Sequence, residues 1–167
     1  FVSGTGLIAG FTTMLGNLSH LLDKAEADAQ ARKYDSLLLA RYRLAPDMLP
    51  FAYQVKSATV HSAGAIEGVR RGLFAPDTGP SPDTFAGLKD RVDAAITLLK
   101  AVEPAELESF IGRDMRFEFG ERRMDFTAEE FLLSFSQPNF YFHAPTQYAI
   151  LPWHGPPIGK RYHPCRV

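Results

Sequence analysis

Residues 136–155 read SQPNFYFHAPTQYAILPWHG, and they decide which fold the chain can adopt. Asn139, His143 and Gln147 stand four residues apart, so on a helix they share one face. The remaining faces are apolar and largely aromatic, with Phe140, Tyr141, Phe142, Tyr148, Ile150, Leu151 and Trp153. A helix that is apolar on most sides is expected to be buried, where an unpartnered polar group costs about 1–3 kcal/mol. The polar stripe therefore predicts an internal hydrogen-bond network or a ligand pocket.

The same stretch departs from the usual rules for helices. Pro138 suits a first helical turn, whereas Pro145 lies inside the pattern, where it would free the carbonyl of Tyr141 and kink the helix. Such departures are expected at functional or strained sites. This helix is therefore the first place to look for a site.

The composition is that of an ordinary globular protein. The 167 residues, of which 46% are hydrophobic and 22% charged, are most simply one domain over residues 1–167, with an irregular tail at 155–167. Lys and Arg total 18 against 19 Asp and Glu, which gives a formal net charge of −1. Because no extended basic run accompanies this balance, nucleic acid is not expected as a partner.

Location is predicted from cysteine use and hydropathy. The single cysteine, Cys165, cannot form an internal disulfide, so we expect a reducing, cytoplasmic compartment. No run of about 18 apolar residues is present, so no membrane span is expected. The apolar residues of Phe1–Leu22 continue at helical spacing, which predicts an amphipathic helix and not a secretory signal.

Apolar periodicity predicts four main helices. They are expected at about Thr5–Arg32, from Pro46 to about Gly72, from a cap at Ser81 or Asp83 to about Val102, and from Thr127 to just before Pro152. Thr127 and Glu130 have the spacing of a capping box, so they mark the start of the last helix. Between residues 115 and 126 apolar side chains alternate with polar ones on both sides of Gly120, which predicts a β-hairpin over one end of a helical bundle. Residues 73–82 are expected to be a loop.

A second polar stripe is predicted on the helix that starts at Pro46. Asp47, Gln54 and His61 are spaced by seven residues, close to two helical turns, so they share a face. If this helix neighbours the last one, His61 and His143 face each other. One alternative is that both are core histidines with satisfied hydrogen bonds. The other is that they carry chemistry.

The chemistry we expect is histidine acid–base catalysis, because it needs only an imidazole with a suitable pKa and a partner that fixes its tautomer. We expect His143 and His61 to be catalytic, with Tyr148 donating to a developing oxyanion. Residues expected to bind a small-molecule substrate are Asn139, Gln147, Gln54, Asp47, Phe142 and Trp153.

No metal and no other cofactor is expected from the residues. Two imidazoles and a carboxamide make a poor transition-metal site. On one straight helix Asp47 and His61 would lie about 21 Å apart, too far to share an ion and too far for direct contact. Motifs for a nucleophilic serine, a phosphate loop or a dinucleotide are lacking.

Four runs of sequence resemble a known superfamily. They are NLSHLLDKAEA (Asn17–Ala27), RLAPDMLPFAYQV (Arg43–Val55), PNFYFH (Pro138–His143) and IGKR (Ile158–Arg161). Together they resemble the DinB-like proteins, and more narrowly a small branch catalogued as a domain of unknown function. The resemblance implies an all-α fold, an antiparallel four-helix bundle with a small β-hairpin inserted before the last helix. It also implies activities that are commonly metal-dependent through three histidines, and in some members thiol-dependent transfer or isomerisation.

The resemblance carries over only in part to the metal ligands. His143 stands at the second histidine of an HxxxH pair, whereas Asn139 stands at the first, and His61 is near the ligand of the second helix. The branch often has a histidine where Ser134 stands and usually lacks the proline found at Pro145. These departures favour a pocket without a metal.

Three functions therefore remain open. The first is a metal-free enzyme of the isomerase, lyase or cyclase type that acts on an apolar or aromatic substrate. The second is a non-catalytic bundle that binds a ligand or forms a homodimer. The third is a metal- or thiol-dependent transferase, as in the wider superfamily.

Overall fold

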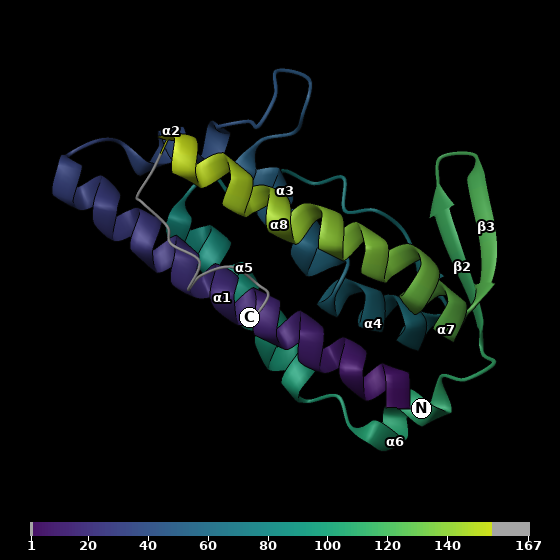
Figure 1. Ribbon diagram of the computed structural model, residues 1–167. Coiled ribbons are helices and arrows are strands. Elements are labelled where there is room, and N and C mark those ends of the chain that lie inside the picture. Colours follow the sequence, from purple (N-terminus) through teal and green to yellow (C-terminus); the bar gives the residue numbers. More distant parts are fainter. Residues whose placement is uncertain (1, 155–167) are drawn as a thin grey trace.

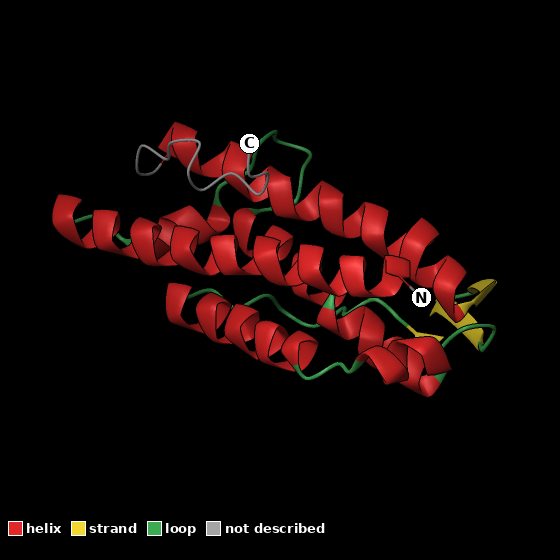
Figure 2. Ribbon diagram, turned by 60° about the horizontal axis from the view of Figure 1, so that its bottom comes forward, coloured by secondary structure: helices red, strands yellow, loops and turns green. Residues whose placement is uncertain are grey.

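The computed structural model describes residues 2–154, with side chains from Gly4 to Leu151. The predicted tail 155–167 and the side chain of Trp153 lie outside this part. The described chain is mostly helical, with a small sheet at one end (Figures 1 and 2). In chain order the elements are α1 (Val2–Arg32), α2 (Ser36–Arg41), α3 (Phe51–Val60), α4 (Ala63–Arg71), β1 (Leu73–Phe74), α5 (Phe85–Lys100), α6 (Pro104–Ser109), β2 (Asp114–Phe119), β3 (Arg122–Thr127), α7 (Ala128–Glu130), the π-helical segment η1 (Phe131–Ser136) and α8 (Gln137–His154).

The core lies between the long helices. α1 packs mainly against α5, and α3 packs against both α8 and α5. The apolar stripe predicted on the first helix is buried, as the fully enclosed side chains of Phe11, Leu15 and Leu21 show. The predicted helix over about residues 5–32 is therefore confirmed, and its apolar face is what attaches it to the rest of the molecule.

The predicted hairpin is confirmed and is part of a larger sheet. β2 and β3 pair antiparallel, with Phe117 opposite Met124. β1, which we expected to be loop, pairs in parallel with β2 and places Phe74 beside Phe117. Sequence periodicity misses β1 because two residues are too few to show an alternation. The sheet thus adds a mixed three-stranded element to a chain expected to be all-α.

The helix predicted from Pro46 begins five residues later. Pro50 is the extended N-cap of α3, and Asp47 lies in an exposed turn in which the amide of Met48 donates to the carbonyl of Ala45. A residue before proline is biased toward extended backbone, so two prolines four residues apart favour a turn here. The placement of Asp47 on the helical stripe was therefore wrong.

The same predicted helix is interrupted at His61 and Ser62. His61 is the C-cap of α3, and Ser62 adopts φ −118° and ψ −89° before α4 begins. The Ser62 hydroxyl donates to the carbonyls of Ala58 and Thr59 at 2.7 and 3.3 Å. A serine that bonds back to the preceding turn competes with the helix and bends it. One predicted helix is therefore two.

Capping decides the remaining helix starts. Thr127 and Glu130 form the predicted capping box at the start of α7. Thr84, and neither Ser81 nor Asp83, caps α5 by accepting from the amide of Gly87. Near Pro138 the π-helical η1 changes to α8, and α8 continues past Pro145 and, contrary to the predicted end, past Pro152 to His154. Within the part that the structure describes, no helix is long and apolar enough to cross a membrane.

Candidate functional site

Two imidazoles lie side by side between α3 and α8. The ring centroids of His61 and His143 are 5.9 Å apart, and the ring planes differ by 10°. His61 sits at the C-terminal end of α3, whereas His143 lies within α8. The packing of α3 against α8 therefore brings together the two histidines that we expected to face each other.

Gln54 determines the tautomer of His143. The Gln54 Nε2 donates to the carbonyl of Leu49 at 3.0 Å, so the Gln54 Oε1 is the atom that faces His143. The His143 Nδ1 lies 2.7 Å from that oxygen. Because a carboxamide oxygen only accepts hydrogen bonds, Nδ1 of His143 carries the proton. The neutral ring then has its lone pair on Nε2, which is the basic atom of this residue.

Gln147 joins the same network one turn further along α8. Its Nε2 donates to the backbone carbonyl of Gln54 at 3.0 Å. Gln54 thus accepts from both His143 and Gln147, and this links α3 to α8 through buried polar groups. In the described part of the molecule, the Oε1 of Gln147 and the Nδ1 of His61 are buried without a hydrogen-bond partner. Such groups are costly to leave unpaired, so they indicate a place where a ligand or water binds.

Aromatic rings surround the two histidines. His61 contacts Phe74 and Phe135, with ring centroids at 5.5 and 6.0 Å. His143 contacts Tyr53 at 6.1 Å and Phe142 at 5.1 Å. An apolar environment disfavours the charged imidazolium. Both rings should therefore be neutral near pH 7.

Burial is the main cause of the low pKa of both histidines. Burial, and to a lesser degree the neighbouring His143, lowers the pKa of His61 from 6.5 to about 4. Burial alone lowers the pKa of His143 to about 4 as well. At pH 7 both rings are therefore neutral. Each can accept a proton, and neither is an imidazolium that could donate one.

A serine from η1 holds the backbone next to His61. The hydroxyl of Ser136, which is fully buried, donates to the carbonyl of His61 at 2.8 Å. We did not expect Ser136, Phe135 or Phe74 to belong to the site. No local pattern could have identified Ser136, because its bond to His61 joins residues 75 positions apart in the chain.

Several residues expected at the site are engaged elsewhere. Asp47 is exposed in the turn before α3 and contributes nothing to the stripe. The Asn139 amide donates to the carbonyl of Phe135, one turn back in its own helical stretch, at 2.7 Å. Tyr148 packs against the core, five residues and hence about 140° around α8 from His143. Phe142 touches His143 but is 57% exposed.

The side chains that the structure describes do not match a metal centre. Among the side chains from Gly4 to Leu151, no group of three or more His, Cys, Asp and Glu could hold an ion. The Nδ1 of His143 is committed to Gln54, and Asn139 to a backbone carbonyl. Two imidazoles without a carboxylate fall short of the three protein ligands that a catalytic metal usually has.

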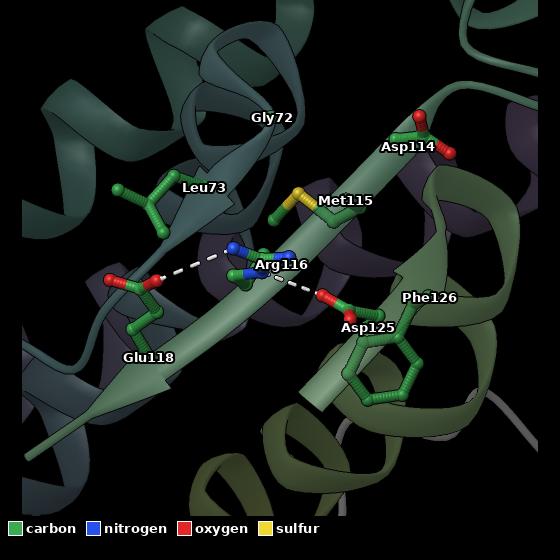
Figure 3. A pocket seen from close by; sticks show the side chains of 8 residues that line it. All are labelled: Gly72, Leu73, Asp114, Met115, Arg116, Glu118, Asp125 and Phe126. Atoms are coloured by element: carbon green, nitrogen blue, oxygen red, sulfur yellow. Dashed lines mark hydrogen bonds and ion pairs between the residues drawn. The ribbon is translucent and has the colours of Figure 1, made fainter. Parts of the chain in front are cut away.

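A separate hollow of about 560 Å³ lies on the sheet (Figure 3). It is lined by Gly72, Leu73, Asp114, Met115, Arg116, Glu118, Asp125 and Phe126. Figure 3 shows Arg116 between two carboxylates: its Nε is 2.6 Å from Asp125 and its Nη1 is 4.0 Å from Glu118. These carboxylates neutralise the arginine, so the hollow offers no unpaired cation to an anionic ligand.

Comparisons with known proteins agree with this architecture. Residues 5–163 match the family model described as a domain of unknown function, DUF1993. The chain is also similar to the crystal structure of a DinB family member protein from Shewanella denitrificans, at 28% identity and a TM-score of 0.76, over 96% of this chain and 90% of that one. No curated protein matches. These findings support the resemblance seen in the sequence, and neither description states an activity.

Proposed function

We propose a function for this chain, which belongs to the DUF1993 family of domains of unknown function: it is an enzyme that acts on a small apolar or aromatic molecule by histidine acid–base chemistry, without a metal. The observation that carries the proposal is the pair of half-buried, neutral imidazoles of His61 and His143, whose rings stack on each other. The reaction class is proton transfer, as in an isomerase, lyase or cyclase.

The tautomer of His143 supports its role as a general base. With Nδ1 protonated and bonded to Gln54, Nε2 is left to remove a proton from a substrate. Gln54 can keep its hydrogen bond when His143 becomes positively charged, so the ring stays oriented through the reaction. A base with a pKa of about 4 is fully in its reactive form above about pH 5, although it is a weak base.

The surroundings of His61 support an apolar or aromatic substrate. Phe74 and Phe135 flank this ring, and Tyr53 and Phe142 flank His143. The buried Nδ1 of His61 has no partner in the described structure, so a polar group of the ligand would satisfy it. A ring or chain with one hydrogen-bonding group fits these two requirements together.

A generic probe of general bases tests the proposal. In the Kemp elimination of 5-nitrobenzisoxazole, a base removes the proton on C3 while the N–O bond breaks, which gives a coloured cyanophenolate. We expect the purified protein to accelerate this reaction, with a rate that is flat near pH 7 and falls below about pH 4. Replacing His143 by Ala should lower the rate at least about tenfold, because it removes the base.

The matched control is His20→Ala, which removes an exposed histidine of α1 and should leave the rate unchanged. Thermal unfolding by circular dichroism shows whether each variant is folded. EDTA should not change the rate, and loss of the rate with chelator would instead favour metal chemistry. An unchanged rate in folded His143→Ala would mean that His143 does not act as the base.

A non-catalytic bundle is the second candidate, and the glutamine network favours it. Gln54, His143 and Gln147 connect α3 to α8 by hydrogen bonds. If these bonds serve stability alone, their removal lowers the free energy of unfolding. If the bundle is non-catalytic, His143→Ala should lower the melting temperature strongly and leave the rate of the Kemp elimination unchanged. Ligand binding or a homodimer, with the exposed Tyr141 and Phe142 at the interface, would then be the function.

Two finer expectations remain part of the proposal, and a third has less support. The packing of α1 on α5 and of α3 on α8 supports an antiparallel four-helix bundle. We keep the cytoplasmic location as an expectation from cysteine use. Metal-dependent transfer, which the DinB-like resemblance implied together with thiol-dependent transfer, has less support because no third ligand lies with His61 and His143 among the described side chains.

A further inference from the structure

We infer that Ser136 is a positioning residue that holds His61 beside His143; the inference rests on the proposed function only for its catalytic consequence. The Ser136 hydroxyl is fully buried and donates to the carbonyl of His61 at 2.8 Å. This bond joins η1 to the junction between α3 and α4. It is the backbone of His61, and not its ring, that Ser136 fixes.

The junction needs such a bond because it lies at the end of a helix. His61 is the C-cap of α3, with φ −84° and ψ 8°, and Ser62 leaves the helical region. Carbonyls at a helix end lack partners within the helix. Ser136 supplies one from another element, and it thereby restrains the peptide that carries the imidazole of His61.

The π-helical segment holds His61 at a second point. Phe135, the residue before Ser136, places its ring 6.0 Å from that of His61. η1 is defined by a wider turn, in which the amide of Gln137 donates to the carbonyl of Leu132. π-turns are rare and occur frequently at functional sites. Here one such turn provides both the hydroxyl that holds the backbone of His61 and the ring that packs on its side chain.

Ser134 offers a matched comparison within the same segment. It is exposed, and its hydroxyl donates to the carbonyl of Glu130, one turn back in its own chain. Both serines therefore donate to a backbone carbonyl from η1, but only Ser136 reaches the residue that carries an imidazole. A general effect of hydroxyl removal in η1 should appear in both variants.

The test compares Ser136→Ala, Ser136→Cys and Ser134→Ala. The pH midpoints of His61 and His143 are measured from imidazole ¹H–¹⁵N shifts, and the Kemp elimination rate is measured with 5-nitrobenzisoxazole. In Ser136→Ala we expect the His61 midpoint to rise from about 4 by about half a pH unit or more, because a less restrained ring gains access to water. The probe rate should fall about tenfold, since a misplaced neighbour of the base disturbs the site.

Ser136→Cys keeps a side chain of similar volume and a weak hydrogen-bond donor, so its changes in the His61 midpoint and in the rate should be smaller than those of Ser136→Ala. It also replaces Ser136→Ala in the test if that variant does not fold. Ser134→Ala should match the wild type in both measurements. A folded Ser136 variant with lower stability but an unchanged His61 midpoint and rate would overturn the inference and make the bond merely structural. A shifted midpoint together with a rate that His143→Ala leaves unchanged would support the positioning role while contradicting the proposed function.

Discussion

Gln54 shows how one carboxamide can set the state of a histidine. Its Nε2 is held by the carbonyl of Leu49, so only its oxygen is available to His143. That oxygen selects the tautomer with the proton on Nδ1. It carries no charge, however, so it does little to offset the burial that lowers the pKa of His143 to about 4.

A negative charge at position 54 should raise the pKa of His143. In Gln54→Glu a carboxylate would replace the amide within hydrogen-bond distance of His143, and an opposite charge at such a distance favours the imidazolium. We expect the pKa of His143 to rise from about 4 by about one pH unit or more. Titration of the ¹H–¹⁵N signals of the ring measures it. Gln137→Glu places the same charge at the start of α8 and should change the pKa little; an equal rise in both variants would contradict the role of the contact.

At the scale of elements, α1 and α8 meet at a glycine. A Cβ placed on Gly10 would lie 2.9 Å from the hydroxyl oxygen of Tyr141, whereas a Cβ on Gly16 would meet nothing within 4 Å. Both glycines lie inside α1. Glycine within a helix costs about 0.5–1 kcal/mol relative to alanine. A comparison of alanine at these two positions therefore distinguishes the intrinsic cost of glycine in a helix from the effect of the contact with Tyr141 of α8.

We expect Gly16→Ala to stabilise the protein by about 0.5–1 kcal/mol. Gly10→Ala should stabilise it less, because the Tyr141 hydroxyl must move. The two changes should become alike in a Tyr141→Phe background, which removes that oxygen. Urea unfolding of the three single and two double variants measures these differences. If Gly10→Ala gains as much as Gly16→Ala with Tyr141 intact, the contact does not restrict the approach of the two helices.

At the scale of the whole molecule, the two histidines couple folding to pH. Each has a pKa of about 4 when folded and an ordinary value of 6.5 when unfolded. Between these values the unfolded chain binds protons that the folded chain does not. The free energy of unfolding should therefore be highest above about pH 6.5 and decrease as the pH falls toward 4. His61 contributes at most about 3 kcal/mol of this loss, and the more accessible His143 contributes less.

Urea unfolding at pH 7 and pH 5.5 measures the decrease. This window lies above the ordinary pKa values of Asp and Glu, so Asp77 and Glu106, whose pKa values arginine partners lower further in the folded protein, stay ionised in both states. The double variant His61→Phe with His143→Phe should flatten the dependence, whereas His20→Ala should retain it. A slope that persists in the double variant would assign the pH dependence to other groups.

Local rules in the sequence were enough for much of the fold. The 3.6-residue period predicted α1, the alternation around Gly120 predicted β2 and β3, and the spacing of Thr127 and Glu130 predicted the capping box. Each of these patterns is short-range, so the residues that define it are neighbours in the chain. The same holds for the stripe of His143 and Gln147, whose four-residue spacing puts both on the face toward α3.

The tertiary structure alone decided the rest, because the deciding contacts are distant in the chain. Spacing placed Asp47 with Gln54 and His61, but two prolines delay the start of that helix until Phe51 and Ser62 breaks it after His61. The two residues of β1 become a strand only because β2 is there to pair with them. Ser136 reaches His61 because η1 docks against the α3–α4 junction. The sequence by itself thus determined the helical class and the shared face of His143 and Gln147. The packing of α3, α8 and η1 determined which polar groups meet, because long-range packing and not local propensity sets the distance between them.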